Sequence, residues 1–192
     1  MSKVFGIGLP KTGTQSLAKA LHRLGIPTLH NPKDFWGLLH KGIVDFPGEW
    51  QGLVHLGMRQ FRQLDRAYPG SKFILTVRDK GAWLASCERQ IKERFVYDAV
   101  QERVRIDAFG STDYHPELFS DAYDAHCWVV LEWFKTLESE RWLVWDLCAT
   151  PEWSIVCDFL EKPLPDQPFP FENNVKDIIK AKNEALRRNR GF

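Results

Sequence analysis

The sequence has almost no net charge. Its 192 residues include 26 lysines and arginines against 25 aspartates and glutamates, which gives a formal charge of +1 at neutral pH. Proteins that attract nucleic acid or anionic membranes through a broad field carry a clear excess of positive charge. That excess is missing, so we expect neither partner. An anionic ligand would have to be held by a local cluster of donors and cations.

Long apolar runs are also missing. The N-terminal stretch "MSKVFGIGLP" contains too short an apolar run for a secretory signal peptide. No segment has the roughly 20 consecutive apolar residues that cross a bilayer as a helix. We therefore expect a protein without a membrane span, located in the cytoplasm.

The cysteines are few, and their spacing lacks the patterns of metal sites. Cys87, Cys127, Cys148 and Cys157 include no Cys-x-x-Cys pair and have no histidines at zinc-binding spacing. All four fall in segments predicted to be core helix or strand. We expect reduced, buried thiols, as in a reducing compartment, and no metal site.

The sequence does contain short apolar runs that alternate with helical patterns. With 44% hydrophobic and 27% charged residues, its composition is globular, and its length suits one domain over residues 1–192. Short apolar runs that end at turn residues predict buried strands. These runs are 3–9, 52–56, 72–77 and 141–147.

Helical patterns fill the intervals between these runs. Thr14 is the expected N-cap of the helix after the first strand, and Asp79 is the expected cap after the third. A long helix with an apolar stripe is predicted from Glu117. Thr150 and Pro151 have the pattern of a cap followed by proline at the first helical position.

Two segments have weaker patterns: residues 97–116 are ambiguous, and 174–190 are predicted to form a polar, basic helix. Strands that alternate with helices nevertheless predict an α/β fold, in which a parallel sheet has helices on both faces.

Three polar side chains fall where the predicted strands end. Lys11 follows the first strand, His55 lies at the end of the second, and Arg78 directly follows the third. In a parallel sheet of this kind, ligands bind beyond the carboxyl ends of the strands. We therefore expect the three side chains to face one crevice.

The loop after the first strand, "GLPKTGTQS", combines two glycines with a lysine and two threonines. In a Walker loop the lysine directly precedes the Ser or Thr that holds Mg²⁺. Here Lys11 comes two residues before Gly13, and no aspartate closes the third strand to hold a metal. The amides from Lys11 to Gln15 can still form an anion nest at a helix start, with the hydroxyls of Thr12 and Thr14 as further donors. The loop predicts a phosphate site and argues against an Mg-ATP hydrolase.

The order Pro-Lys-Thr-Gly-Thr after a strand resembles the sulfotransferase family. In that family, a loop of this form grips the 5′-phosphosulfate of 3′-phosphoadenylyl sulfate (PAPS). A second block, "FILTVRDKGAWLAS", is similar to the family's strand-Arg-helix-Ser element, with Arg78 and Ser86 eight residues apart. The chain also looks like a small subfamily that shares "FGIGLPKTGTQSL", "YPGSKFILTVRD", "YDAH" and "CDFLEKPLPDQPFPFEN". These blocks run in order over roughly residues 4–174.

The resemblance implies a three-layer P-loop NTPase-like fold and a PAPS-dependent sulfotransferase. Such an enzyme moves a sulfuryl group from PAPS to a small hydroxyl or amine acceptor and releases PAP, without a metal. The positions that match the family's cofactor-binding motifs are Pro10, Lys11, Thr12, Gly13, Thr14, Gln15, Arg78 and Ser86. Among them, Arg78 and Ser86 would bind the 3′-phosphate. Lys11 would also be catalytic, because it could neutralise charge on the oxygen between sulfur and phosphorus.

A base must take the acceptor's proton. His55 is the first candidate, because it ends a strand that faces the crevice and its "VHL" block resembles the family's His-Leu element. A neutral imidazole near pH 7 suits this task. His126, beside the apolar stripe of the long helix, is the second candidate, although a hydrogen-bonded core histidine is the more common role for such a residue. Trp83 is expected in the core rather than as an adenine platform.

Two other interpretations remain open at this point. A nucleotide kinase-like phosphotransferase would bind Mg-ATP, which the missing Gly-Lys-Ser/Thr opposes. A non-catalytic PAP-binding or interaction protein would bind PAP without turnover, and the sequence alone does not separate it from the enzyme.

Acceptor contacts are expected from residues 31–50 and 95–116, where the patterns are weakest and loops carry specificity. The family's late Arg-Lys-Gly element over the 3′-phosphate has no counterpart here, and the basic residues of 174–190 are its possible substitute. The oligomeric state is open.

Overall fold

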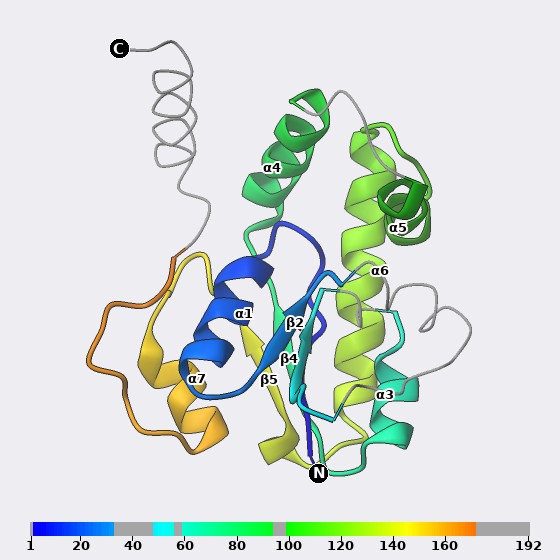
Figure 1. Cartoon of the computed structure of the whole chain (residues 1–192). Coiled ribbons are helices and arrows are strands. Elements are labelled where there is room, and N and C mark those ends of the chain that lie inside the picture. Colours follow the sequence, from blue (N-terminus) through cyan, green and yellow to red (C-terminus); the bar gives the residue numbers. More distant parts are fainter. Residues whose placement is uncertain (1, 33–47, 56–58, 94–98, 172–192) are drawn as a thin grey trace, which may run out of the picture.

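The centre of the fold is a five-stranded parallel sheet in the order β2-β3-β1-β4-β5 (Figure 1). The computed structural model describes residues 2–32, 48–55, 59–93 and 99–171. The strands are Val4–Gly6 (β1), Thr28–His30 (β2), Gly52–Val54 (β3), Lys72–Thr76 (β4) and Trp142–Trp145 (β5). In register, Val4 lies opposite both Gly52 and Lys72, which makes β1 the central strand. The predicted α/β class with a parallel sheet is confirmed.

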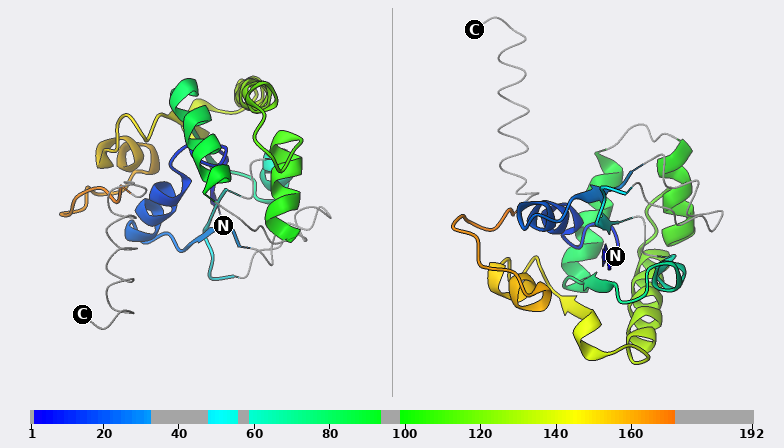
Figure 2. Two further views of the ribbon diagram at one scale, coloured as in Figure 1. Left: turned by 90° about the horizontal axis from the view of Figure 1, so that it is seen from above. Right: turned by 60° about the horizontal axis from the view of Figure 1, so that its bottom comes forward.

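Helices cover both faces of this sheet. The α-helices are Thr14–Arg23 (α1), Phe61–Ala67 (α3), Lys80–Lys92 (α4), Ala99–Phe109 (α5), Pro116–Phe134 (α6) and Trp153–Leu160 (α7), and Ser139–Arg141 is a 3₁₀ turn (η2). Viewed from above, α1 and α7 lie to one side of the sheet and α5 and α6 to the other (Figure 2). The loop after β1 lies at the end of the sheet nearest α4 (Figure 1).

The two sides of the sheet carry two separate cores, because successive residues of a strand point to opposite faces. Val4 and Ile74 pack with α1 and α7. Phe5 and Phe73 belong to the other core, with their ring centroids 5.3 Å apart, and Phe73 meets Trp133 of α6 edge to face at 4.8 Å. These buried strands position the loops at their carboxyl ends.

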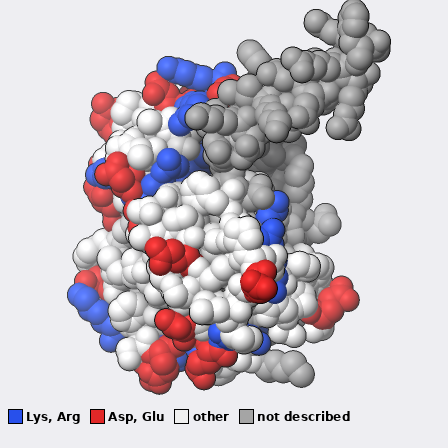
Figure 3. All heavy atoms as spheres, turned by 90° about the vertical axis from the view of Figure 1, so that its left-hand side faces the viewer, with Lys and Arg blue, Asp and Glu red and all other residues white. Residues whose placement is uncertain are grey.

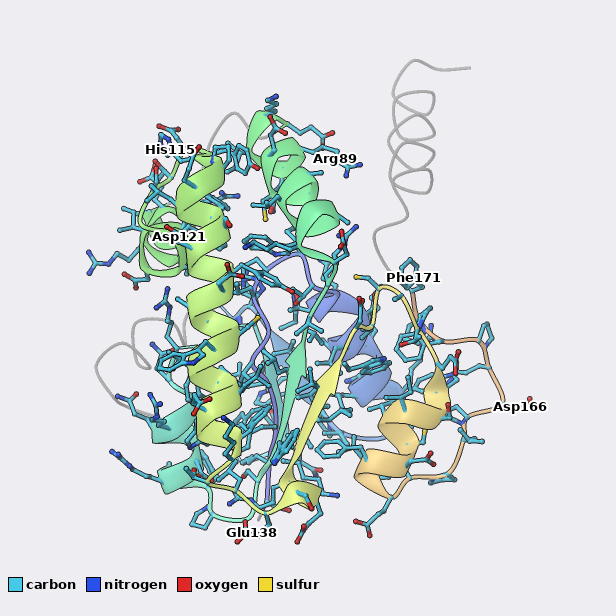
Figure 4. The ribbon with its side chains drawn as sticks, turned by 180° about the vertical axis from the view of Figure 1, so that it is seen from behind. Arg89, His115, Asp121, Glu138, Asp166 and Phe171 are labelled. Carbon is cyan, nitrogen blue, oxygen red and sulfur yellow. The ribbon has the colours of Figure 1, made fainter. Side chains whose placement is uncertain are left out.

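Helix α6 runs along the whole sheet and beyond it. Its N-cap His115 lies at the end of the molecule where Arg89 of α4 lies, and Glu138, just after the helix, lies at the opposite end (Figure 4). The apolar stripe predicted from Glu117 faces inward, with Phe119 fully buried. The predicted long helix is therefore confirmed and begins one residue earlier, at Pro116.

The helix starts after β1 and β4 were predicted with different success. Asp79 caps α4 as predicted, because its carboxylate accepts a hydrogen bond from the amide of Ala82 at 2.8 Å. The prediction for α1 is wrong by one residue: Thr14 is the first helical residue, and the cap is Gly13 with φ 93°. Gly13 adopts this left-handed conformation at little cost, because it lacks a β-carbon.

The predicted start of the last described helix, α7, is also wrong. Thr150 does not cap it; its hydroxyl donates to the carbonyl of Asp146 at 3.1 Å. The N-cap is Glu152, so α7 begins after the Thr-Pro pair. The sequence has the pattern of a cap, but the Thr150 hydroxyl is bonded to the carbonyl of Asp146 in the turn before the helix and does not reach the helix amides.

Two elements lie where the sequence patterns were weak. The short strand β2 was not predicted, because its three residues are only partly buried and show no apolar run. Part of the ambiguous segment 97–116 forms α5, whose buried residues include Val104 and Phe109. The basic segment 174–190 lies outside the described residues.

Charged side chains of both signs are interspersed over the face shown in Figure 3, as the small net charge suggests. Among the described residues, no helix combines the length and apolar character needed to cross a membrane. All four cysteines are free thiols, and Cys148 lies in the turn after β5 rather than in a helix or strand.

Gly8 offers a direct test of how closely the loop packs on the sheet. A β-carbon at Gly8 would overlap the Thr76 hydroxyl and lie 2.5 Å from the Thr76 carbonyl oxygen. We expect Gly8→Ala to lower the free energy of unfolding by about 1–3 kcal/mol, measured by urea denaturation, because a neighbouring strand must shift. Gly48→Ala is the control, since a β-carbon there meets no atom of the described residues within 4 Å. Equal losses in the two variants would contradict the packing described.

Candidate functional site

The three residues predicted to share a crevice follow neighbouring strands of the sheet. Lys11 lies in the loop after β1, His55 directly follows β3, and Arg78 follows β4. The Arg78 Nη1 group donates a hydrogen bond to the carbonyl oxygen of Lys11 at 3.2 Å. The charge of Lys11 also acts on the imidazole of His55. The structure therefore brings all three together at the carboxyl edge of the sheet.

Three consecutive carbonyl oxygens of the loop, those of residues 9–11, each accept a hydrogen bond from a side chain. The pairs are Thr12 Oγ1 with Leu9 (2.6 Å), Trp83 Nε1 with Pro10 (2.8 Å) and Arg78 Nη1 with Lys11 (3.2 Å). In a trans peptide, the carbonyl and the following amide point in opposite directions. The amide of Lys11 therefore points away from Trp83, whose fully buried ring confirms the expected core position.

The hydroxyl of Thr12 is engaged within the protein. Besides the carbonyl of Leu9, it lies 2.6 Å from the Thr76 hydroxyl of β4, and its residue is fully buried. A ligand contact from Thr12 would thus come from its amide, which also makes a long bond of 3.4 Å to Leu9. The hydroxyl instead joins the loop to the neighbouring strand.

The start of α1 is suited to an anion. The first amides of a helix have no partner within the helix, and they carry its positive dipole end. Gly13 brings no capping side chain, and the first turn of α1 contains no acidic residue. Any other residue at position 13 would be crowded, because its β-carbon would come within 2.9 Å of the Leu147 side chain. No carboxylate of this turn therefore occupies the place that a phosphate would take.

Three residues with strained backbone conformations lie at the carboxyl edge of the sheet. Lys11, Asn31 and His55 have φ values of 73°, 50° and 86°, and they follow β1, β2 and β3. The left-handed region costs a residue with a β-carbon about 1–2 kcal/mol. Strain of this kind persists only where surrounding contacts hold it, and it concentrates at functional sites.

Thr14 lies between two histidines. Its Oγ1 is 3.5 Å from Nδ1 of His55 and 3.3 Å from Nε2 of His30, the last residue of β2. The two rings meet edge to face, with centroids 5.5 Å apart. The sequence did not single out His30, because the strand that carries it has no apolar pattern.

Both imidazoles are kept neutral at neutral pH. Burial, together with the smaller effects of the charges of His30 and Lys11, lowers the pKa of His55 to about 3. Burial also lowers the pKa of His30. Desolvation penalises the charged imidazolium, so a proton on either ring is costly unless an anion lies nearby.

The "YDAH" block of α6 attaches that helix to the site. The Tyr123 hydroxyl donates to the carbonyl of Arg78 at 2.6 Å and accepts from the Arg78 amide at 3.1 Å. Burial raises the pKa of Tyr123 to about 12, so the donating proton stays in place. Asp124 pairs with Lys80 at the start of α4. These contacts fix the backbone from which the Arg78 guanidinium extends.

His126, the last residue of the block, is a core histidine, as expected from its position. Its side chain is buried, and Nε2 donates a hydrogen bond to the carbonyl of Ile7 at 2.8 Å. Burial lowers the pKa of His126 to about 4, although the hydrogen bond to Ile7 opposes this shift. The residue supports the end of β1, directly before the loop.

Ser86 lies on the buried side of α4. Burial raises the pKa of its neighbour Cys87 to about 12, and the charges of Lys11, Arg105 and Arg78 partly offset this rise. This part of α4 is therefore within electrostatic reach of the loop cation and of Arg78. Arg105 of α5 is itself buried, and the sequence did not mark it because its segment was ambiguous.

Parts of the expected acceptor regions, 33–47 and 95–98, lie outside the described residues, as does the basic segment after residue 171. Within the described ranges, no three His, Cys, Asp or Glu side chains are grouped as a metal ion would require.

The fold and this edge define an α/β protein in which the loop after the central strand leads into a helix without a side-chain cap. A family model described as "Sulfotransferase domain" matches residues 3–45 and 47–178, and the chain belongs to this family. A search of curated proteins finds no match. Among solved structures, a sulfotransferase from Alicyclobacillus acidocaldarius matches with a TM-score of 0.58 and 17% identity, over 94% of this chain and 90% of that one. This likeness shows the shared fold.

The buried imidazole of His126 makes stability depend on pH. In the unfolded chain a histidine titrates near its ordinary pKa of about 6.5, whereas His126 in the folded protein titrates at about 4. The unfolded state therefore binds more protons between these values. We expect the free energy of unfolding to fall as pH decreases through this window, by at most about 1.4 kcal/mol per pH unit for this residue.

Denaturant unfolding at several pH values checks this expectation. His126→Gln keeps a donor for the Ile7 carbonyl but cannot titrate, so its stability should fall less steeply with decreasing pH. His22→Gln, at an exposed position of α1, controls for the loss of a histidine. If His126→Gln and the wild type lost stability equally, the account of the buried imidazole would be wrong.

Proposed function

We propose that this chain is a PAPS-dependent sulfotransferase that transfers a sulfuryl group to a small hydroxyl or amine acceptor. The observation that carries the proposal is the loop after β1, with its carbonyls bonded inward and an uncapped helix start behind it. Lys11 lies within this loop, and Arg78 lies beside it. Membership of the sulfotransferase family supports the assignment.

The loop would hold the 5′-phosphosulfate end of the cofactor. The amides of residues 11–15, that of Thr12 included, would be the donors, and Pro10 would orient the turn while its carbonyl is bound by Trp83. The ammonium group of Lys11 would neutralise charge on the bridging oxygen. Preorganised donors of this kind are effective because they need no rearrangement during the reaction.

The 3′-phosphate would be bound by Arg78 and Ser86. A guanidinium has five N–H donors, and Arg78 uses one of them on the carbonyl of Lys11. Within the described residues the other donors have no acceptor and would serve an oxyanion, while the Tyr123 hydroxyl bonds the backbone of Arg78. Ser86 lies two helical turns further along, on the buried side of α4.

His55 would take the proton of the acceptor. When bound, PAPS supplies the sulfuryl group that passes to the acceptor oxygen or nitrogen as PAP is released. His55 is neutral at pH 7 and can accept the proton, and Lys11 stabilises the charge left on the 5′-phosphate. An anion beside Lys11 would offset the charge that depresses the pKa of His55, which makes the imidazole a stronger base in the loaded site.

The setting would be the cytoplasm, which the four free thiols support. A sulfuryl group carries less charge than a phosphoryl group, so positioned cations and amides can replace a metal.

Calorimetric titration with PAP tests the binding half of the proposal. We expect the wild type to bind PAP, and Lys11→Ala to weaken binding by about 10- to 100-fold, because one charge-assisted contact is lost. Lys135→Ala is the matched control, since this lysine is exposed and pairs with Glu132 at the far end of α6. If the protein bound ATP with Mg²⁺ and did not bind PAP, the proposal would be overturned in favour of a phosphotransferase.

Turnover separates an enzyme from a protein that only binds PAP. The wild type is incubated with sulfur-labelled PAPS and a panel of small phenols, alcohols and amines, and labelled product is measured. We expect transfer to at least one class, reduced by a factor of about 10² or more in His55→Gln with PAP affinity retained. PAP binding without transfer to any acceptor would favour the non-catalytic interpretation.

A further inference from the structure

The two histidines and the threonine at the carboxyl edge form a chain of hydrogen-bonding groups. Nε2 of His30 lies 3.3 Å from the Thr14 hydroxyl, and this hydroxyl lies 3.5 Å from Nδ1 of His55. Catalytic hydrogen bonds are often long before substrates bind and shorten in the loaded site. The inference drawn from this chain rests on the proposed function, because it concerns the base.

The hydroxyl of Thr14 has one proton and can donate to only one of the two rings. The other ring must then donate to the hydroxyl oxygen. Two directions are possible, and they give His55 opposite tautomers. If the chain runs from His55 to His30, His55 carries its proton on Nδ1. If it runs the other way, His55 carries its proton on Nε2.

The position of Thr14 decides which nitrogen of His55 is left for a substrate. Since Nδ1 is bound to Thr14, only Nε2 can face an acceptor, and a base needs a lone pair on that atom. We propose that Thr14 and His30 are positioning residues that hold His55 in its Nδ1–H tautomer. In this arrangement His55 Nδ1–H donates to Thr14 Oγ1, and the Thr14 hydroxyl donates to Nε2 of His30.

The surroundings favour this role for both residues. Thr14 is 5% exposed, so its hydroxyl serves the histidines rather than a ligand, while its amide belongs to the loop. The backbone of His55 is held by its amide, which donates to the carbonyl of Gly6 at 3.1 Å, and by its φ of 86°. The ring can then be oriented by a single side-chain contact.

Neutral rings are a condition for this chain, because a doubly protonated His30 could not accept from Thr14. Among the described residues, the charged or titratable groups that act on His55 are His30 from β2 and Lys11 from the loop. Burial disfavours the charged form of both imidazoles. The chain therefore holds at neutral pH and is lost when His30 gains a proton, whereas a His55 protonated on both nitrogens would still donate from Nδ1.

Nitrogen-15 NMR of the histidine side chains in the full chain, without ligand and at neutral pH, tests the proposal. His55→Gln and His30→Gln assign the two sets of ring signals. In the wild type we expect His55 to show a protonated Nδ1 and an unprotonated Nε2. A wild-type His55 with its proton on Nε2 would overturn the proposal.

Matched variants test whether the chain sets this tautomer. Thr14→Val keeps the shape but removes the hydroxyl, and it should shift His55 toward Nε2–H; Thr14→Ser should retain the wild-type form. His30→Phe should act like Thr14→Val, whereas His30→Gln should retain the tautomer because its amide oxygen can still accept from Thr14. An unchanged His55 in both Thr14→Val and His30→Phe would contradict the proposal.

Kinetics connect the tautomer to the reaction. In Thr14→Val we expect kcat with PAPS and an acceptor to fall about tenfold or more, with restoration in Thr14→Ser and little change in the KM for PAPS. A shifted tautomer with an unchanged kcat would refute the positioning role. The NMR result does not depend on turnover, so a failure of the proposed function appears separately, as absent PAP binding or absent transfer in the wild type.

Discussion

The site depends on the hydrogen bonds that hold three consecutive carbonyl oxygens of the loop after β1. Their donors come from the loop itself, from the start of the segment after β4, and from α4. Because these carbonyls are satisfied from within the protein, the loop can keep a left-handed lysine, and in the proposed function its amides would face the phosphate. Without these three hydrogen bonds, nothing would offset the backbone strain at Lys11, and the loop would relax into an ordinary turn.

The rest of the structure supports this arrangement from both sides. Helix α6 binds the end of β1 through His126 and the backbone of Arg78 through Tyr123, so one helix positions both the start of the loop and the segment after β4. A protein with a net charge of only +1 can thus gather two cationic residues at one edge of its sheet, since Lys11 and Arg78 are brought together by a hydrogen bond to the backbone and not by overall charge. The block "YDAH" therefore has a structural explanation.

The sequence predicted the parallel sheet and the meeting of Lys11, His55 and Arg78, because the carboxyl ends of neighbouring parallel strands share one edge. It did not predict β2, whose three partly buried residues have no apolar run, and so it missed His30. It also could not show that the Thr12 hydroxyl turns inward, because that depends on Thr76, which lies 64 residues away in the chain. Local patterns predict elements and their edges, whereas contacts between distant residues decide which side chains are left for a ligand.

A crystal structure of the chain with PAP would test the central claim most directly. The account places the 5′-phosphate within hydrogen-bonding distance of the amides at residues 11–15, and the 3′-phosphate on the guanidinium of Arg78 beside Ser86. The carbonyls of Leu9 and Pro10 should keep their inward hydrogen bonds, because the loop is already formed before binding. A PAP molecule bound elsewhere, or with neither phosphate on these groups, would contradict the account.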